Sequence, residues 1–253
     1  MIGVVIPSAG RSGGLSKAVA SVRGFPVIVV DDSKEGIMHI EGVTIVRTEG
    51  LQGFSKAANI GLVEMQKNGI DRVLLLNDDA VMESGGLSSI DAEWSEEDGA
   101  LAPILHEPDG VVYGIRVQPF GRIRLVRKPG PVQALSGASL FIRASERFDP
   151  NYAHGFEDIE LCRRLAGRNL RVRCVETIHC HHGAGQSVSR RSRLAQRHAV
   201  HGHLRFVHGG ITSIVVVLLA VLQVIRERGP ADRLIGIMEG VRDYFRVDPL
   251  PLP

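Results

Sequence analysis

The segment Val73–Ala80, VLLLNDDA, constrains the fold more than any other part of the sequence. Four bulky apolar residues run without alternation into Asn77, Asp78 and Asp79. A short continuous apolar run predicts a strand buried on both faces, as in the middle of a parallel sheet. Ligands of open α/β sheets bind beyond the carboxyl ends of such strands. Two carboxylates there suit Mg²⁺ or Mn²⁺, although a plain turn that caps the next helix uses the same residue types.

The first hundred residues repeat this pattern of apolar runs and helical segments. Further buried strands are expected at Ile2–Pro7, Pro26–Val30 and Val43–Val46, and helices at Leu15–Val22 and Phe54–Asn68. The strand that begins at Pro26 also ends in paired acids, Asp31 and Asp32. Strands alternating with helices predict a parallel, nucleotide-binding type of half-domain.

The second half has a different pattern. A DG dipeptide at Asp109 predicts a hairpin over 100–115. Further strands are expected at Arg122–Val126, Ser139–Arg143 and Leu170–Val175. A helix is expected over 156–166, and the acids Glu157 and Asp158 in its first turn complement the helix dipole.

Composition favours a globular protein with an uneven charge distribution. Hydrophobic residues make up 44% and charged residues 23% of the chain, which is ordinary for a soluble domain. Residues 1–160 carry 15 Lys and Arg against 22 Asp and Glu, a net charge of −7. Residues 161–205 carry ten Arg and one acid, a net charge of +9. Because arginine binds phosphate well, this segment predicts a phosphate-bearing partner.

The chain also carries signals of cellular location. The three cysteines, Cys162, Cys174 and Cys180, lack CxxC spacing, which favours reduced thiols in a cytoplasm over a zinc site with the neighbouring histidines. Met1 leads directly into a strand-like run, so no signal peptide is expected. We therefore expect a cytoplasmic protein.

Seven motifs occur in order along residues 1–205: VVIPSAGR, VVDDS, GFSKAANIG, LLLNDDA, LSGASLFIR, FD(x)₇EDIELCRR followed by RNLRV, and HHGAGQS. By these motifs the chain resembles the family-2 glycosyltransferases with a GT-A fold, and within them the rhamnosyltransferase-like enzymes of surface polysaccharide assembly. The resemblance implies an α/β fold with a mixed central sheet. Its Rossmann-like nucleotide-sugar-binding half would span 1–99 and its acceptor half 100–205, followed by a C-terminal helical tail over 206–253.

The resemblance also implies roles for individual residues. Asp158 would be the catalytic base, with Glu157 on the acceptor side. Asp79 would hold the metal, Mn²⁺ or Mg²⁺, together with His181, for which His179 and His182 are possible substitutes. The residues expected at the nucleotide sugar are Pro7, Asp31, Asp32, Asn59, Asn77, Asp78 and Gly137. Asp32 and Asp31 would face the base and Asp78 the ribose, whereas Asn77 replaces the usual first Asp of a DXD-type motif.

The implied reaction transfers a sugar from a UDP, dTDP or GDP donor to a hydroxyl of a glycan or lipid-linked acceptor. One base and one displacement invert the anomeric carbon, since a double displacement needs a second carboxylate as nucleophile. Two alternatives remain open. A sugar nucleotidyltransferase would use PSAGRSGGLSK as a phosphate loop, and a non-catalytic protein would bind an anionic ligand through the arginines. Nucleic acid is not expected as a partner, and single-strand binding is disfavoured because Phe206 is the only aromatic residue between Phe156 and Tyr244.

The apolar segment Ile211–Ile225 has three possible placements. It is shorter than the roughly 20 residues of a membrane span. A helix buried on the domain or in a homodimer is favoured over an interfacial helix at the inner face of the cell membrane, and a true span is least favoured. The Pro-rich end, RVDPLPLP, is expected to be loose.

Overall fold

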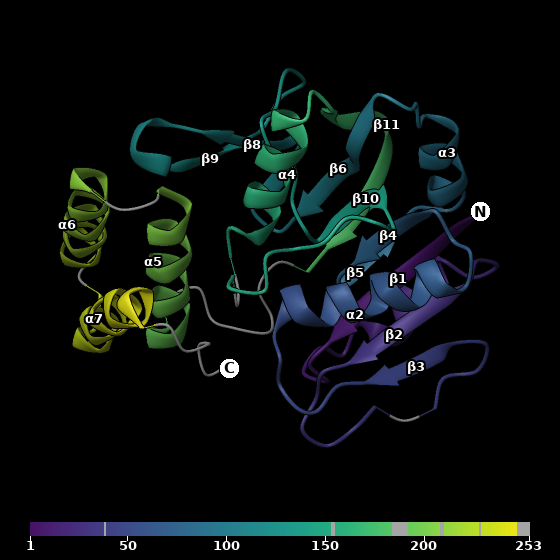
Figure 1. Ribbon diagram of the computed structural model, residues 1–253, viewed down its shortest axis with the longest axis horizontal. Coiled ribbons are helices and arrows are strands. Elements are labelled where there is room, and N and C mark those ends of the chain that lie inside the picture. The colour runs from purple at the N-terminus through teal and green to yellow at the C-terminus, as the bar shows by residue number, and fades with distance from the viewer. Residues whose placement is uncertain (38, 153–154, 184–191, 208–209, 228, 247–253) are drawn as a thin grey trace.

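A computed structural model describes residues 1–253 except 38, 153–154, 184–191, 208–209, 228 and 247–253 (Figure 1). The large sheet that it describes has the strand order β3-β2-β1-β4-β10-β6-β11-β5, with β7 paired to β6. These strands are β1 (Ile2–Ser8), β2 (Val27–Asp31), β3 (Thr44–Arg47), β4 (Arg72–Leu76), β5 (Ala80–Met82), β6 (Asp98–Glu107), β7 (Gly110–Val112), β10 (Ser139–Arg143) and β11 (Arg171–His182).

The direction of the strands sets where their ends meet. β1 is parallel to β2 and β4, and β6 is parallel to β11. β10 is antiparallel to both β4 and β6, so β4 and β6 run the same way. The carboxyl ends of β1, β2, β4, β6 and β11 therefore all lie at one edge of the sheet. This is the edge at which ligands bind in open α/β sheets.

Helices cover both faces of the sheet and bury two apolar clusters. α2 (Phe54–Lys67) and α4 (Glu157–Gly167) contribute Leu62, Met65 and Leu165 to the core of one face. α1 (Leu15–Ser21) and α3 (Gly86–Ala92) contribute Ala18 and Ile90 to the core of the other. A strand with apolar cover on both sides has no need of alternation, which is why the run 73–76 is continuously hydrophobic.

The predicted elements of residues 1–182 are observed, with a few differences. The strand expected to end at Val175 continues to His182, because β11 stays paired with β6 past a register shift between Val175 and His179. β5 and α3 were not predicted. The hairpin expected over 100–115 is observed as β6 and β7, but the predicted strand 111–115 is divided between β7 and β8 (Gly114–Val117). β8 pairs with the strand predicted after Arg122, β9 (Ile123–Val126), through a short 3₁₀ turn, η1 (Pro119–Gly121).

In the part of the chain that the structure describes, three helices follow the sheet: α5 (Arg193–Val207), α6 (Ile211–Arg226) and α7 (Ala231–Phe245). α5 packs closely on α7, since a Cβ added at Gly236 or Gly240 would lie 2.4 or 2.5 Å from a carbonyl oxygen of α5. The boundary expected after residue 205 falls inside α5. The segment 211–225 is helical, as expected. None of the helices described combines the length and hydropathy needed to cross a membrane.

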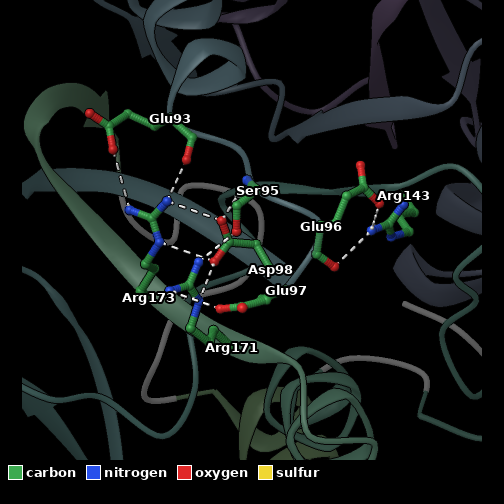
Figure 2. A network of polar contacts seen from close by, with 8 residues as sticks. All are labelled: Glu93, Ser95, Glu96, Glu97, Asp98, Arg143, Arg171 and Arg173. Atoms are coloured by element: carbon green, nitrogen blue, oxygen red, sulfur yellow. Dashed lines mark hydrogen bonds and ion pairs between the residues drawn. The ribbon is translucent and has the colours of Figure 1, made fainter.

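The opposite edge of the sheet carries a network of ion pairs, shown in Figure 2. Asp98, at the start of β6, is fully buried and accepts hydrogen bonds from Arg171 Nε (3.2 Å) and Arg173 Nη2 (3.0 Å) at the start of β11. Burial alone would raise the pKa of Asp98, but the hydrogen bonds from Arg173 and the Ser95 amide lower it. Several of the arginines that suggested a phosphate ligand are thus paired with acids inside the fold.

Candidate active site

The segment that follows β1 folds onto the turn after β4, which consists of Asn77, Asp78 and Asp79 and is called the NDD turn below. Ser8 Oγ donates a hydrogen bond to Asp78 Oδ2, and Ser12 Oγ donates to the Asp78 carbonyl oxygen (2.9 Å). Gly14 approaches so closely that an added Cβ would lie 2.7 Å from the same oxygen. Burial, and then repulsion by Asp79, raise the pKa of Asp78. Ser8, Ser12 and Gly14 were not singled out in the sequence, where their signal is the Gly- and Ser-rich stretch between the first strand and helix.

The carboxylate of Asp79 pairs with His182. His182 Nε2 lies 3.2 Å from Asp79 Oδ1 and 3.4 Å from Asn77 Nδ2, and its Nδ1 lies 3.4 Å from Glu107 Oε1. Burial alone would lower the pKa of His182, but the two carboxylates raise it to about 9. Glu107, at the end of β6, was not anticipated.

The histidine beside Asp79 is therefore His182 rather than the expected His181. Successive side chains of a strand point to opposite faces, so only one of the two neighbours can face Asp79. His181 is 62% exposed, lies 4.0 Å from Glu83, and stacks on His106, which also contacts His179. The rest of the HHGAGQS motif, from residue 184, lies outside the described residues.

The expected metal site can be compared with the arrangement of the side chains that the structure describes. No group of three or more His, Cys, Asp or Glu side chains among them is arranged to hold a metal ion. Mg²⁺ and Mn²⁺, however, are commonly held by one or two protein carboxylates together with substrate phosphates and waters. Asp79 fits such a site, which a diphosphate would complete. His182 can add a nitrogen ligand only by releasing the proton that Asp79 and Glu107 stabilise, because a histidine ligand is the neutral imidazole.

Asp31 and Asp32 are buried, and their carboxylates accept hydrogen bonds from their own loops. Asp31 accepts from the hydroxyl and the amide of Ser33 and from the amide of Ile37; burial alone would raise its pKa, but these hydrogen bonds, the hydroxyl's first, lower it. Asp32 accepts from Thr48 Oγ1 and from the amides of Gln52 and Gly53, at 2.7 to 2.8 Å, just before α2. Both acids therefore shape the loops at the ligand edge, and their contact with a nucleotide base stays a prediction.

Two expected nucleotide-sugar residues have clear structural surroundings. The side-chain amide of Asn59 donates to the Phe148 carbonyl and accepts from its N–H, both at 2.8 Å. This pair of bonds joins α2 to the loop before α4, and the contact of Asn59 with a nucleotide sugar stays a prediction. Pro7 lies near the end of β1, paired in register with Val30 and partly buried.

Asp158 lies at the start of α4 and faces Gly137. Its Oδ2 accepts a hydrogen bond from the Gly137 amide at 2.8 Å, and its Oδ1 accepts from the Ile159 amide. The residue after Gly137, Ala138, contacts the NDD turn. Its carbonyl oxygen accepts a hydrogen bond from the Asn77 amide at 3.0 Å. Burial raises the pKa of Asp158.

Glu157 is 8% exposed, and its Oε2 has no hydrogen-bond partner among the described residues. Burial, and then the neighbouring Asp158, raise the pKa of Glu157. A carboxyl group in these surroundings holds its proton more readily than one in water.

The C-terminal helices α5, α6 and α7 are called the helical unit below, and α5 packs against the residues at the start of α4. Phe156, directly before α4, has a φ of 71° and stacks on His203 of α5 with ring centroids 5.0 Å apart. Gly202 lets α5 approach, since an added Cβ would lie 2.6 Å from the Gly155 carbonyl oxygen. The turn that orients Asp158 is therefore packed between the sheet domain and the C-terminal helices.

Neither protein-family models nor curated proteins match the sequence. Solved structures do. The chain is similar to GalNAc-T7, crystallised with UDP, GalNAc and Mn²⁺, at 16% identity and a TM-score of 0.62 over 81% of this chain. The chain covers 47% of that protein, about half its length.

A second similarity is to TarS of S. aureus. The structure of its residues 1–349 has a TM-score of 0.55 at 14% identity, over 96% of this chain and 71% of that one. The same segment in complex with UDP-GlcNAc has a TM-score of 0.51 at 14% identity, over 87% and 70%. Identities this low establish the fold alone. The chain thus has the mixed α/β architecture of the GT-A glycosyltransferases, which confirms the predicted fold class.

Proposed function

We propose that this protein is an inverting glycosyltransferase that moves a sugar from a nucleoside diphosphate to an acceptor hydroxyl. The observation that carries the proposal is the connection between Asp79 and Asp158. Two hydrogen bonds tie the turn that holds Asp79 to the turn that holds Asp158: the Asn77 amide donates to the Ala138 carbonyl, and the Gly137 amide donates to the Asp158 carboxylate. A donor at one turn and a base at the other is the arrangement that the reaction requires. The fold shared with GalNAc-T7 and TarS supports the glycosyltransferase class, and the inverting course is proposed from the single base.

Asp79 and His182 would hold a divalent ion, Mn²⁺ or Mg²⁺, with the donor diphosphate as the remaining ligand. When bound, such an ion supplies positive charge that stabilises the departing nucleoside diphosphate. Ser8 and Ser12 hold the Asp78 segment in place beside it, and Asp78 would meet the ribose. The loops shaped by Asp31 and Asp32 would receive the base.

Asp158 would take the proton of the acceptor hydroxyl as that oxygen attacks the anomeric carbon. Its raised pKa suits this role, because a general base works best when its pKa lies near the working pH. The hydrogen bonds from Gly137 and Ile159 fix the carboxylate without using all of its lone pairs. A single displacement of this kind inverts the anomeric configuration.

A donor-hydrolysis screen tests the proposal. UDP-, dTDP- and GDP-sugars are incubated with Mn²⁺ or Mg²⁺, and released nucleoside diphosphate is measured. We expect metal-dependent release from at least one donor, abolished in Asp79→Ala and in His182→Asn. Asp71→Ala and His181→Asn are the matched controls, because Asp71 is exposed at the opposite end of β4 and His181 points away from Asp79.

Two results would contradict the proposal. One is nucleotide release that continues at the same rate after all divalent metal is chelated. The other is release of pyrophosphate from a nucleoside triphosphate and a sugar phosphate, which would indicate a nucleotidyltransferase.

A further inference from the structure

One face of α6 is apolar and uncovered. Its exposed residues recur at helical spacing, and each side chain is more than half exposed: Ile211, Ile214, Leu218, Leu222 and Ile225. The opposite side packs Val216 and Val224 into the helical unit. An exposed helix face is normally polar, and a contiguous apolar patch on a surface usually marks an interaction site.

The hairpin of β8 and β9 ends next to this helix. Its turn, η1, contacts both α5 and α6, and His203 Nε2 lies 2.7 Å from the Phe120 carbonyl oxygen. Figure 1 shows the hairpin extending over the end of α5 on the side of α6. The tip adds two further exposed apolar side chains, Phe120 at 50% and Ile123 at 46%.

The hairpin segment is also strongly cationic. From Gly110 to Gly130 the sequence has five Lys and Arg and no acid. Arg122 and Arg124 are exposed at the tip, and Arg124 lies opposite Arg116 across the hairpin, on the face opposite to that of Ile123. Apolar side chains flanked by arginines are the pattern that binds the interface of an anionic bilayer, where apolar area and charge attraction act together.

We propose that the apolar face of α6 and the β8–β9 tip dock this protein on an anionic lipid membrane. A second copy of the chain fits this surface poorly. A two-fold dimer would place the same patch on both sides of the interface, so the hairpin arginines would be brought toward arginines. Lipid phosphates provide the opposite charge. The proposal is independent of the proposed catalytic function.

Co-sedimentation of the full chain with vesicles tests it. We expect binding to phosphatidylglycerol-containing vesicles that falls as salt is raised, and little binding to phosphatidylcholine alone. The triple variant Ile214→Ser, Leu218→Ser, Leu222→Ser should lose binding, because it removes the apolar contact. Arg122→Glu with Arg124→Glu should weaken binding by about tenfold or more. The matched control, Arg23→Glu with Lys34→Glu, reverses two exposed cations elsewhere and should bind as the wild type does.

Several outcomes would overturn the proposal. The full-length protein could stay in the supernatant with anionic vesicles at low salt, or the serine variant could bind unchanged. Equal losses in the control and the hairpin variant would show attraction by net charge alone. A wild-type dimer in sedimentation velocity that the serine variant converts to monomer, without vesicle binding, would identify a second copy as the occupant. Circular dichroism and the Tm verify that each variant is folded.

Discussion

Glu157 and Asp158 are adjacent carboxyl groups at the start of α4, and burial raises the pKa of both. The folded state therefore holds these protons more tightly than the unfolded chain does. Their contribution to stability is complete below the unfolded-state pKa and is lost as pH rises through the folded-state pKa. Ionising either carboxyl group in its buried position therefore lowers the free energy of unfolding. This cost falls at the site where the proposed chemistry takes place.

Replacing Glu157 with Gln should reduce this pH dependence. The amide is of similar size but cannot ionise, so the variant should lose less stability between about pH 5 and about pH 8 than the wild type. We expect its Tm relative to the wild type to rise by about 2–4 °C across this range, the equivalent of about 1 kcal/mol. Thermal unfolding followed by circular dichroism at several pH values measures it. If the Tm of the two proteins changed with pH in the same way, ionisation of Glu157 would have no effect on stability, which would contradict this prediction.

At the scale of elements, the start of β6 and the start of β11 are held together by Asp98. Asp98→Ala would leave Arg171 and Arg173 without this buried acceptor, and we expect a loss of about 2–4 kcal/mol in the free energy of unfolding. Glu97→Ala is the matched control, because Glu97 is 76% exposed and pairs with Arg171 at the surface. Its loss should stay below about 1 kcal/mol. Urea unfolding compares the two, and equal midpoints would mean that the Asp98 network adds no stability.

At the scale of the whole molecule, local patterns predicted the strands and the helices between them. The buried strand before Asn77 and the position of the acids after it could be predicted from neighbouring residues alone. Contacts set by long-range register were not accessible. Which of His181 and His182 faces Asp79 depends on how β11 pairs with β5. The hydrogen bonds that Asp32 accepts from the amides of Gln52 and Gly53 join residues 20 and 21 positions apart. The same limit applies to α5, whose packing on Phe156 depends on a helix folding back on the sheet domain.

The proposed function depends most directly on Asp158 acting as the base of the sugar transfer. The most direct measurement is the rate of donor hydrolysis by Asp158→Asn, together with its affinity for the donor by calorimetry. Asparagine keeps the size of the side chain but cannot accept a proton, so we expect the rate to fall about a hundredfold or more while donor affinity stays close to that of the wild type. Asp71→Asn, on the opposite edge of the sheet, should change neither. Hydrolysis by Asp158→Asn at the wild-type rate would contradict the account.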